Sequence, residues 1–404
     1  MDALSPLPAL LALLLVVACS WLVVRVMGAP ASQGRFESID GLRGYLAFGV
    51  FLHHGSIWYA NLRTGAWDEP PSHLYNHLGQ SSVALFFMIT GFLFFSKLLN
   101  GRARPIDWLQ LYVSRLLRLM PLYLCALACI LVLVGVLSDW ILQAPLGSLV
   151  SGIVRWLSFG EPDLNGLART RILVAGVTWS LRYEWIFYLS LPLFALLLGV
   201  RLAWGWLLPA LLAIAAFLLL QLNAIHLLSF VGGLIAALLA RQEAFTHVAR
   251  TGYASVLVLS CLAVAVLGFP SAFGPEPLLL LSLAFVLIAC GNTLFGALVS
   301  PASRALGEMA YSIYLLHGLL LFVLFRFVIG AERARAFSPS EHWLSVLAVV
   351  PVLLLICQLS WRFIEQPPMR YQAIVTARLR GLFGQGPALD IAGVAAYKEK
   401  AGSQ

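Results

Sequence analysis

The sequence predicts an all-α protein, a polytopic membrane bundle of about eleven transmembrane helices, and three observations support this. Hydrophobic residues make up 61% of the 404 residues and charged residues only 11%, whereas a soluble domain carries about 25% charged residues. The apolar residues are grouped into stretches of roughly 17–25 residues, the length at which a helix spans a bilayer. A chain this apolar has too few polar side chains to cover a surface that faces water, so its solvent is lipid.

The predicted spans follow one another along most of the chain, at 8–27, 40–60, 80–99, 117–137, 178–200, 203–221, 224–240, 252–269, 277–297, 309–329 and 342–364. No Lys or Arg precedes the first span, while Arg25 and Arg35 follow its apolar run. This pattern favours an uncleaved helix with its N-terminus outside over a signal peptide. The segment 141–157 is apolar but interrupted by Pro145 and by glycines, so we expect it to lie flat or re-enter.

Charge gives the direction of insertion. The net charge is +8, but the basic residues lie between the spans, which is typical of membrane topology and does not indicate nucleic-acid binding. If 141–157 does not span, the basic loops all fall on the cytoplasmic side. The outer loops, at 61–79, 138–177 and 330–341, then mix polar and aromatic residues, which suits a carbohydrate-sized partner; ordinary interfacial aromatics are the alternative. We divide the chain into an N-terminal helix (1–30), a membrane domain (31–370) and a short cytoplasmic tail (371–404) that contacts membrane lipids.

The cysteines do not indicate a metal site. All six lie inside apolar stretches, and no two of them form a Cys-x-x-Cys pair. We interpret them as small buried hydrophobic residues and expect neither disulfides nor a bound metal.

Ionisable side chains inside a span are costly and therefore mark candidate functional sites. Arg43 and His54 are eleven residues apart on the second span, which puts them about 20° apart around a helix and about 16 Å apart along it. Asp40 lies one turn before Arg43 and is close enough to pair with it. His53 points about 100° away from His54, so we expect only one of the two to face a pocket and choose His54. The alternative is a snorkelling Arg with two interfacial histidines.

Three later segments add candidates. Arg115 and Arg118, one turn apart, suit bidentate phosphate binding; ordinary positive-inside anchoring is the alternative. Glu184 lies inside an apolar run and needs a partner, a proton or water. The same segment contributes Trp179 and Ser180, and a late span carries Ser312, Tyr314 and His317.

Together these segments resemble the acyltransferase 3 family of integral membrane acyltransferases. The matching pieces, in chain order, are IDGLRG at 39–44 with His54 eleven residues beyond Arg43, FFMITGFL at 86–93, Arg115 and Arg118 followed by Pro121, WSLRYEWIFYL at 179–189, SIYLLH at 312–317 and FIEQP at 363–367. Each motif is weak alone, but the ordered set covers most of the chain. One departure is Thr90, where the family motif often has Ser.

The resemblance implies about ten core helices with both core ends in the cytoplasm, here with one extra helix at the N-terminus. Members of the family move acyl groups, often acetyl, from cytoplasmic acyl-CoA to extracytoplasmic glycans or to small molecules. Arg43 and His54 match the essential Arg and His of the family, and Arg115 and Arg118 match its donor-side basic pair.

We therefore predict a membrane-embedded O-acyltransferase of the inner membrane that uses acyl-CoA, most simply acetyl-CoA, as donor substrate. Arg43, Arg115 and Arg118 bind the phosphates of the donor, and the pantetheine arm passes Ser312, Tyr314 and His317. His54 is the general base, with Glu184 or Asp40 as orienting carboxylates and Trp179 and Ser180 on the acceptor side. The expected acceptor is O-antigen or another surface polysaccharide, and a lipid-linked glycan or a small natural product is the alternative. The competing classes are a transporter, which usually shows internal repeats that we do not find here, and a non-catalytic scaffold.

Overall fold

The structure, a computed structural model, describes residues 3–30, 36–102 and 105–382. Within these residues every regular element is a helix, apart from one isolated bridge between Leu164 and Leu167. This confirms the all-α prediction. The α-helices are α1 (Pro6–Met27), α2 (Glu37–Thr64), α3 (His73–Asn100), α4 (Trp108–Leu137), α5 (Leu146–Leu157), α6 (Thr178–Leu197), α7 (Leu207–Leu219), α8 (Ala224–Leu239), α9 (Glu243–Ala249), α10 (Gly252–Gly268), α11 (Pro275–Ala289), α12 (Pro301–Glu308), α13 (Ala310–Val323), α14 (Ala331–Arg335), α15 (Pro339–Ser360), α16 (Gln366–Arg370) and α17 (Gln372–Leu382).

Five stretches of the described chain are long and apolar enough to cross a membrane. They are α1, α3, α4, α13 with its continuation to Val328, and Pro339–Arg370; α8 and α9, bent by 111° relative to each other, form a possible sixth. Each of the eleven predicted segments contains a helix, but several of these helices are shorter than 18 residues. A multi-pass membrane protein is therefore supported, whereas the number of eleven spans stays a prediction.

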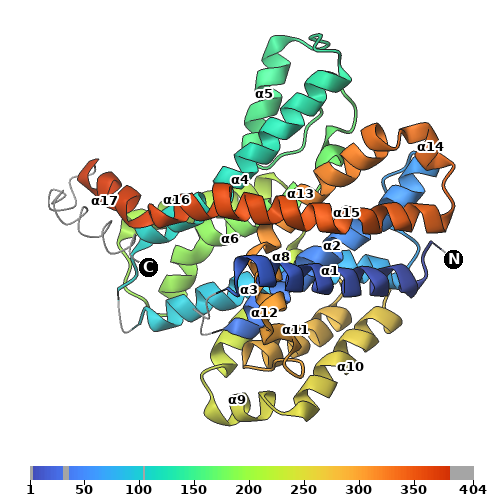
Figure 1. Cartoon of the computed structure of the whole chain (residues 1–404). Helices are drawn as coiled ribbons and strands as arrows, with labels where there is room; N and C mark the ends of the chain where they lie inside the picture. The colour runs from blue at the N-terminus through green and yellow to red at the C-terminus, as the bar shows by residue number, and fades with distance from the viewer. Residues whose placement is uncertain (1–2, 31–35, 103–104, 383–404) are drawn as a thin grey trace.

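The ambiguous segment 141–157 forms α5, a helix of 12 residues. Its length is about 18 Å, well short of the ~30 Å hydrocarbon core of a bilayer. The hydroxyl of Tyr123 in α4 donates to the carbonyl of Trp156, which holds α5 against α4, and Figure 1 shows the two projecting together from the bundle. This length agrees with the expectation that the segment does not span.

Helix α2 lies at the centre of the bundle, and glycines make this possible. A Cβ at Gly41 would lie 1.8 Å from the carbonyl oxygen of Leu298, and one at Gly307 would lie 1.9 Å from the carbonyl oxygen of Asp40. Only glycine permits backbones to approach this closely. The IDGLRG motif thus packs α2 against α12 and against the turn that precedes α12. This packing fixes the backbone position of Arg43.

Close backbone packing at glycines also joins α3 to α8. A Cβ at Gly91 would lie 2.6 Å from the carbonyl oxygen of Phe230, and one at Gly233 would lie 2.3 Å from that of Met88. The FFMITGFL motif is therefore a helix-packing motif. Since α3 also packs along α2, it forms the wall between α2 and α8 on which the candidate site is built.

The two ends of the bundle differ. At one end the Trp343 indole donates to the carbonyl of Ala3, and the Tyr75 hydroxyl donates to that of Ser5. Figure 1 shows this end, with the N-terminus and α14, opposite the end that carries α17. The N-terminus and the 330–341 loop thus share a face, as the predicted topology requires.

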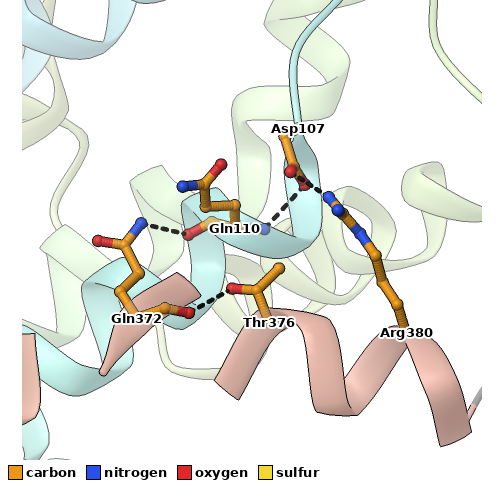
Figure 2. A network of polar contacts seen from close by, with 5 residues as sticks. All are labelled: Asp107, Gln110, Gln372, Thr376 and Arg380. Atoms are coloured by element: carbon orange, nitrogen blue, oxygen red, sulfur yellow. Dashed lines mark hydrogen bonds and ion pairs between the residues drawn. The ribbon is translucent and has the colours of Figure 1, made fainter. Parts of the chain in front are cut away.

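At the other end the predicted tail begins as an ordered helix. Figure 2 shows α17 packed on the start of α4: Arg380 forms an ion pair with Asp107, and the Gln372 amide donates to the Gln110 carbonyl at 3.5 Å. The remainder of the predicted tail, 383–404, lies outside the described residues.

Candidate active site

His54 is buried in α2 and makes a hydrogen bond to a second histidine from far along the chain. Its Nδ1 lies 2.9 Å from Nε2 of His317 on α13 and 3.0 Å from the carbonyl oxygen of Val50. Nδ1 of His317 lies 2.9 Å from the carbonyl oxygen of Ile313. The two imidazole rings are stacked, with centroids 5.0 Å apart and planes 28° from parallel.

These partners assign the tautomer of both rings when they are neutral. A carbonyl oxygen only accepts, so Nδ1 of His317 carries its proton and Nε2 of His317 is an acceptor. Nδ1 of His54 must then carry a proton to donate to His317. The Nε2 atom of His54 is left with a free lone pair, which is the form that a general base needs.

His54 faces a cavity of about 290 Å³ that we call the histidine chamber, lined by His53, His54, Trp179, His226 and Tyr314 among others. The prediction that only one of the two adjacent histidines faces a pocket is therefore wrong. Both line this chamber, with ring centroids 4.9 Å apart. The contacts of the two still differ, because Nδ1 of His53 lies 2.8 Å from the backbone carbonyl of Tyr75 instead of a second imidazole.

The three predicted donor-side arginines lie together in a second cavity. This arginine chamber, of about 250 Å³, is lined by Arg43, Arg115 and Arg118 together with apolar and aromatic side chains of α3, α4 and α6. Asp40 also lines it, with Oδ1 4.0 Å from Nη1 of Arg43. Three guanidiniums facing a partly apolar cavity have the chemistry to bind an anionic head group with an apolar arm.

Glu184 lies in the arginine chamber, with its carboxylate oriented by α3 and α6. It accepts a hydrogen bond from the Tyr188 hydroxyl and a longer one, 3.5 Å, from the Thr90 hydroxyl. Both Asp40 and Glu184 line this cavity and not the histidine chamber. The side chain that hydrogen-bonds to His54 is His317 instead of a carboxylate.

The two cavities share two lining residues, Val83 and Tyr314. The Tyr314 hydroxyl is held at this junction by the Ser180 hydroxyl at 2.7 Å and by the carbonyl of Val177 at 3.1 Å. Arg43 and His54 thus lie on one helix with a chamber beside each, and the side chains at 83 and 314 line both chambers.

Comparison with known proteins identifies the family of the chain. A family model described as an acyltransferase domain matches residues 36–362, most of the chain. The chain belongs to the acyltransferase 3 family. The acyltransferase MdmB of Streptomyces mycarofaciens is 26% identical over 386 residues, an alignment that covers 84% of this chain and 93% of the relative. No solved structure matches the chain significantly.

Membership of this family makes the protein a membrane acyltransferase and removes the transporter and scaffold alternatives. The family motifs now have positions in space. The predicted base, His54, and the predicted acceptor-side Trp179 line the histidine chamber, whereas Ser180 lines the arginine chamber.

Two residues expected along the acyl-CoA arm lie elsewhere. His317 contacts His54, as described above. The Ser312 hydroxyl is turned toward the end of α15 and donates to the buried carboxylate of Glu365, in the turn that follows α15. Helical spacing placed His317 one turn after Tyr314 but carried no information about which neighbouring helix each side chain would meet. Of the three, Tyr314 alone lines a chamber.

Sequence reasoning also missed three residues of the histidine chamber: Glu69, Gln80 and His226. They come from a loop, from α3 and from α8, and no motif connects them. One signal was available for His226, an imidazole near the start of an apolar helix. Glu365 is part of the FIEQP motif but was not predicted as a site residue. In the structure it lies in a π-helical turn (Trp361–Glu365), a feature that often occurs at functional sites.

Proposed function

We propose that the protein moves an acyl group from cytoplasmic acyl-CoA to a hydroxyl group of an extracytoplasmic acceptor, with acetyl-CoA as the donor and a surface glycan such as O-antigen or another polysaccharide as the acceptor. The membrane concerned is the inner membrane. One observation carries this proposal: the arginine chamber and the histidine chamber meet at Val83 and Tyr314. A donor held in the first chamber reaches the base in the second through this junction.

The arginine chamber supports the choice of donor. Coenzyme A carries phosphates on a long, weakly polar arm, and a guanidinium recognises phosphate through paired, charge-assisted hydrogen bonds. Arg43, Arg115 and Arg118 supply these groups, while Phe86, Leu93 and other apolar residues supply walls for the arm. In the predicted topology this chamber lies toward the cytoplasm, where acyl-CoA is available.

The chemistry follows from the tautomer of His54. The free Nε2 takes the proton of the acceptor hydroxyl as its oxygen attacks the thioester carbonyl carbon. The new ester C–O bond forms, the C–S bond breaks, and the sulfur of coenzyme A takes the proton back from the imidazolium. His317 accepts a hydrogen bond from Nδ1 of His54 throughout, so that Nε2 stays aimed at the reacting oxygen.

The test is turnover by the purified, full-length protein. We expect it to bind radiolabelled acetyl-CoA and to transfer the label to a glycan extract prepared from a strain that lacks the gene. Mass spectrometry of that strain's surface glycan should show the loss of acetyl substituents. Acetyl-CoA binding that is absent, or no weaker in an Arg115→Ala, Arg118→Ala double variant, contradicts the donor assignment.

A further inference from the structure

We propose that the outer part of the histidine chamber is an acceptor subsite that selects an uncharged, hydroxyl-bearing ring and excludes anionic acceptors, with His226 as its specificity-determining residue. The proposal rests on the proposed function, since it assigns the acceptor of that reaction. Three observations carry it: an unpartnered imidazole, a fixed carboxylate and the charge of the chamber lining.

His226 is an imidazole held in place by aromatic rings. Its ring centroid lies 5.0 Å from that of Trp179, 5.0 Å from Tyr183 and 4.2 Å from Phe273, edge-on to the last two. Its Nδ1 is buried and has no hydrogen-bond partner among the described residues. Buried polar atoms in native proteins are nearly always paired. Since His226 also lines the histidine chamber, a ligand bound in the chamber is the partner that we assign to this ring.

Glu69 supplies a second polar group, and its position is fixed by Gln80. The Gln80 amide donates to Oε1 of Glu69 at 2.7 Å. The Gln80 carbonyl accepts from the Ser271 hydroxyl at 2.7 Å and from the Ala272 backbone at 2.9 Å. Both hydrogen-bonding ends of the amide are therefore engaged, which holds one carboxylate oxygen of Glu69 and leaves the other as an acceptor for a donating hydroxyl.

The two chambers differ in charge, and this difference sets the kind of acceptor. The arginine chamber has three guanidiniums, whereas the described residues that line the histidine chamber include no Lys or Arg and one carboxylate, Glu69. An acceptor carrying a phosphate or carboxylate at this position would meet like charge without a compensating cation. A neutral acceptor meets hydrogen-bonding and apolar groups without a like charge.

The size and the walls of the chamber favour a single ring. Its volume of about 290 Å³ is at the lower end for ligand pockets, which run from ~300 to 1,000 Å³. Trp179 and Phe273 present aromatic surface, which packs against the C–H faces of a saturated ring while Glu69 and His226 meet hydroxyls at its edge. His54 lines the same chamber, so a further hydroxyl of that ring lies within reach of the base.

The experiment uses the full-length protein with acetyl-CoA and measures acceptor-stimulated release of the coenzyme A thiol. The acceptor probes are methyl α-glucopyranoside, the anionic glucuronate and the acyclic alcohol 1-butanol. We expect stimulation by the pyranoside and none by the other two. His226→Phe keeps an aromatic ring at this position but has no ring nitrogen, so it should lower stimulation about tenfold or more with unchanged acetyl-CoA binding. Glu69→Gln should admit glucuronate.

His73→Phe is the matched control, because His73 is exposed and lines neither chamber; its activity should equal that of the wild type. Three results would overturn the subsite. The first is pyranoside stimulation of His226→Phe at the wild-type level, and the second is glucuronate stimulating the wild type as strongly as the pyranoside does. The third is a wild-type protein that binds acetyl-CoA but does not respond to the pyranoside. A wild-type protein that does not bind acetyl-CoA overturns the proposed function, and the subsite with it.

Discussion

At the scale of single residues, the hydrogen-bond chain from the Ile313 carbonyl through His317 to His54 decides which imidazole nitrogen is free. Each link involves a distance of 2.9 Å. In the proposed reaction His317 is a positioning residue, because it affects the acyl acceptor only through its hydrogen bond with His54. Its effect should therefore appear in the rate of transfer and not in donor binding.

Replacing His317 tests this role. His317→Leu removes the side-chain acceptor for Nδ1–H of His54 and leaves the Val50 carbonyl as the remaining acceptor. We therefore expect kcat to fall about 10-fold, the lower end of the effect of removing a partner that orients an imidazole. The KM for acetyl-CoA should not change. His317→Gln retains a side-chain acceptor and should recover part of the rate. Steady-state kinetics of both variants provide the check, and equal rates in the two would contradict the orienting role.

Arg118 tests the donor chamber. Arg118→Ala removes a charge-assisted hydrogen-bonding group worth about 1.5–3 kcal/mol, so the KM for acetyl-CoA should rise about 10- to 100-fold. Arg118→Lys should restore little, because an ammonium lacks the planar fork. The exposed Arg201 provides the control, and its Ala variant should bind acetyl-CoA normally. An Arg118→Ala variant with wild-type KM would remove Arg118 from the donor site.

The sequence predicted some of these residues and not others for a physical reason. Helical periodicity within α2 placed Arg43 and His54 on one face, and each lines a chamber. The partner of His54 is 263 residues away, and pairing between distant helices leaves no mark on local spacing. Glu69, Gln80 and His226 were missed for the same reason.

At the scale of helices, hydropathy located each predicted segment, while close packing was set by glycines whose contacts lie on other helices. Gly233 provides the test at a position between α3 and α8, since an added Cβ would lie 2.3 Å from the Met88 carbonyl oxygen. Gly233→Ala should lower the free energy of unfolding by about 1–3 kcal/mol. Gly268→Ala is the control, because its Cβ meets nothing within 4 Å. Thermal unfolding in detergent compares the two, and equal stability would contradict the packing account.

The ion pair between Arg380 and Asp107 makes the docking of α17 depend on pH. Partial burial raises the pKa of the Asp107 carboxyl, but hydrogen bonds from the Gln110 backbone and from Arg380 outweigh it, and the net pKa is lower than usual. A carboxyl with a lowered pKa stabilises the docked state fully above its ordinary pKa of about 3.9 and loses this contribution as pH falls through the lowered value. We expect α17 to be docked at neutral pH and released in acid.

Asp107→Asn should release α17 at neutral pH. Hydrogen exchange of peptides from 372–382 measures this, with rates corrected for intrinsic exchange, and faster exchange is expected in the variant. Asp68→Asn, at an exposed loop position, is the control. In this variant the peptides from 372–382 should exchange at the wild-type rate. Unchanged exchange in Asp107→Asn would show that the ion pair does not hold the helix.

At the scale of the whole molecule, the account requires the arginine chamber to open toward the cytoplasm. The sequence predicted the multi-pass bundle because its apolar stretches are long, but helices of fewer than 18 residues do not reveal by length whether each one crosses. Thiol labelling decides the orientation. In a variant without the six native cysteines, Gly65→Cys should react with an impermeant maleimide in intact cells. Gly381→Cys should react only after permeabilisation, and the reverse pattern would contradict the topology.

The most direct test of the account is acetyl transfer by purified His54→Ala, measured with radiolabelled acetyl-CoA and the glycan extract of the deletion strain. The account predicts that this variant binds acetyl-CoA as the wild type does, because His54 does not line the arginine chamber, and that transfer falls to background. Transfer at the wild-type rate would contradict the claim that two chambers joined at Val83 and Tyr314 bring a bound thioester to this imidazole.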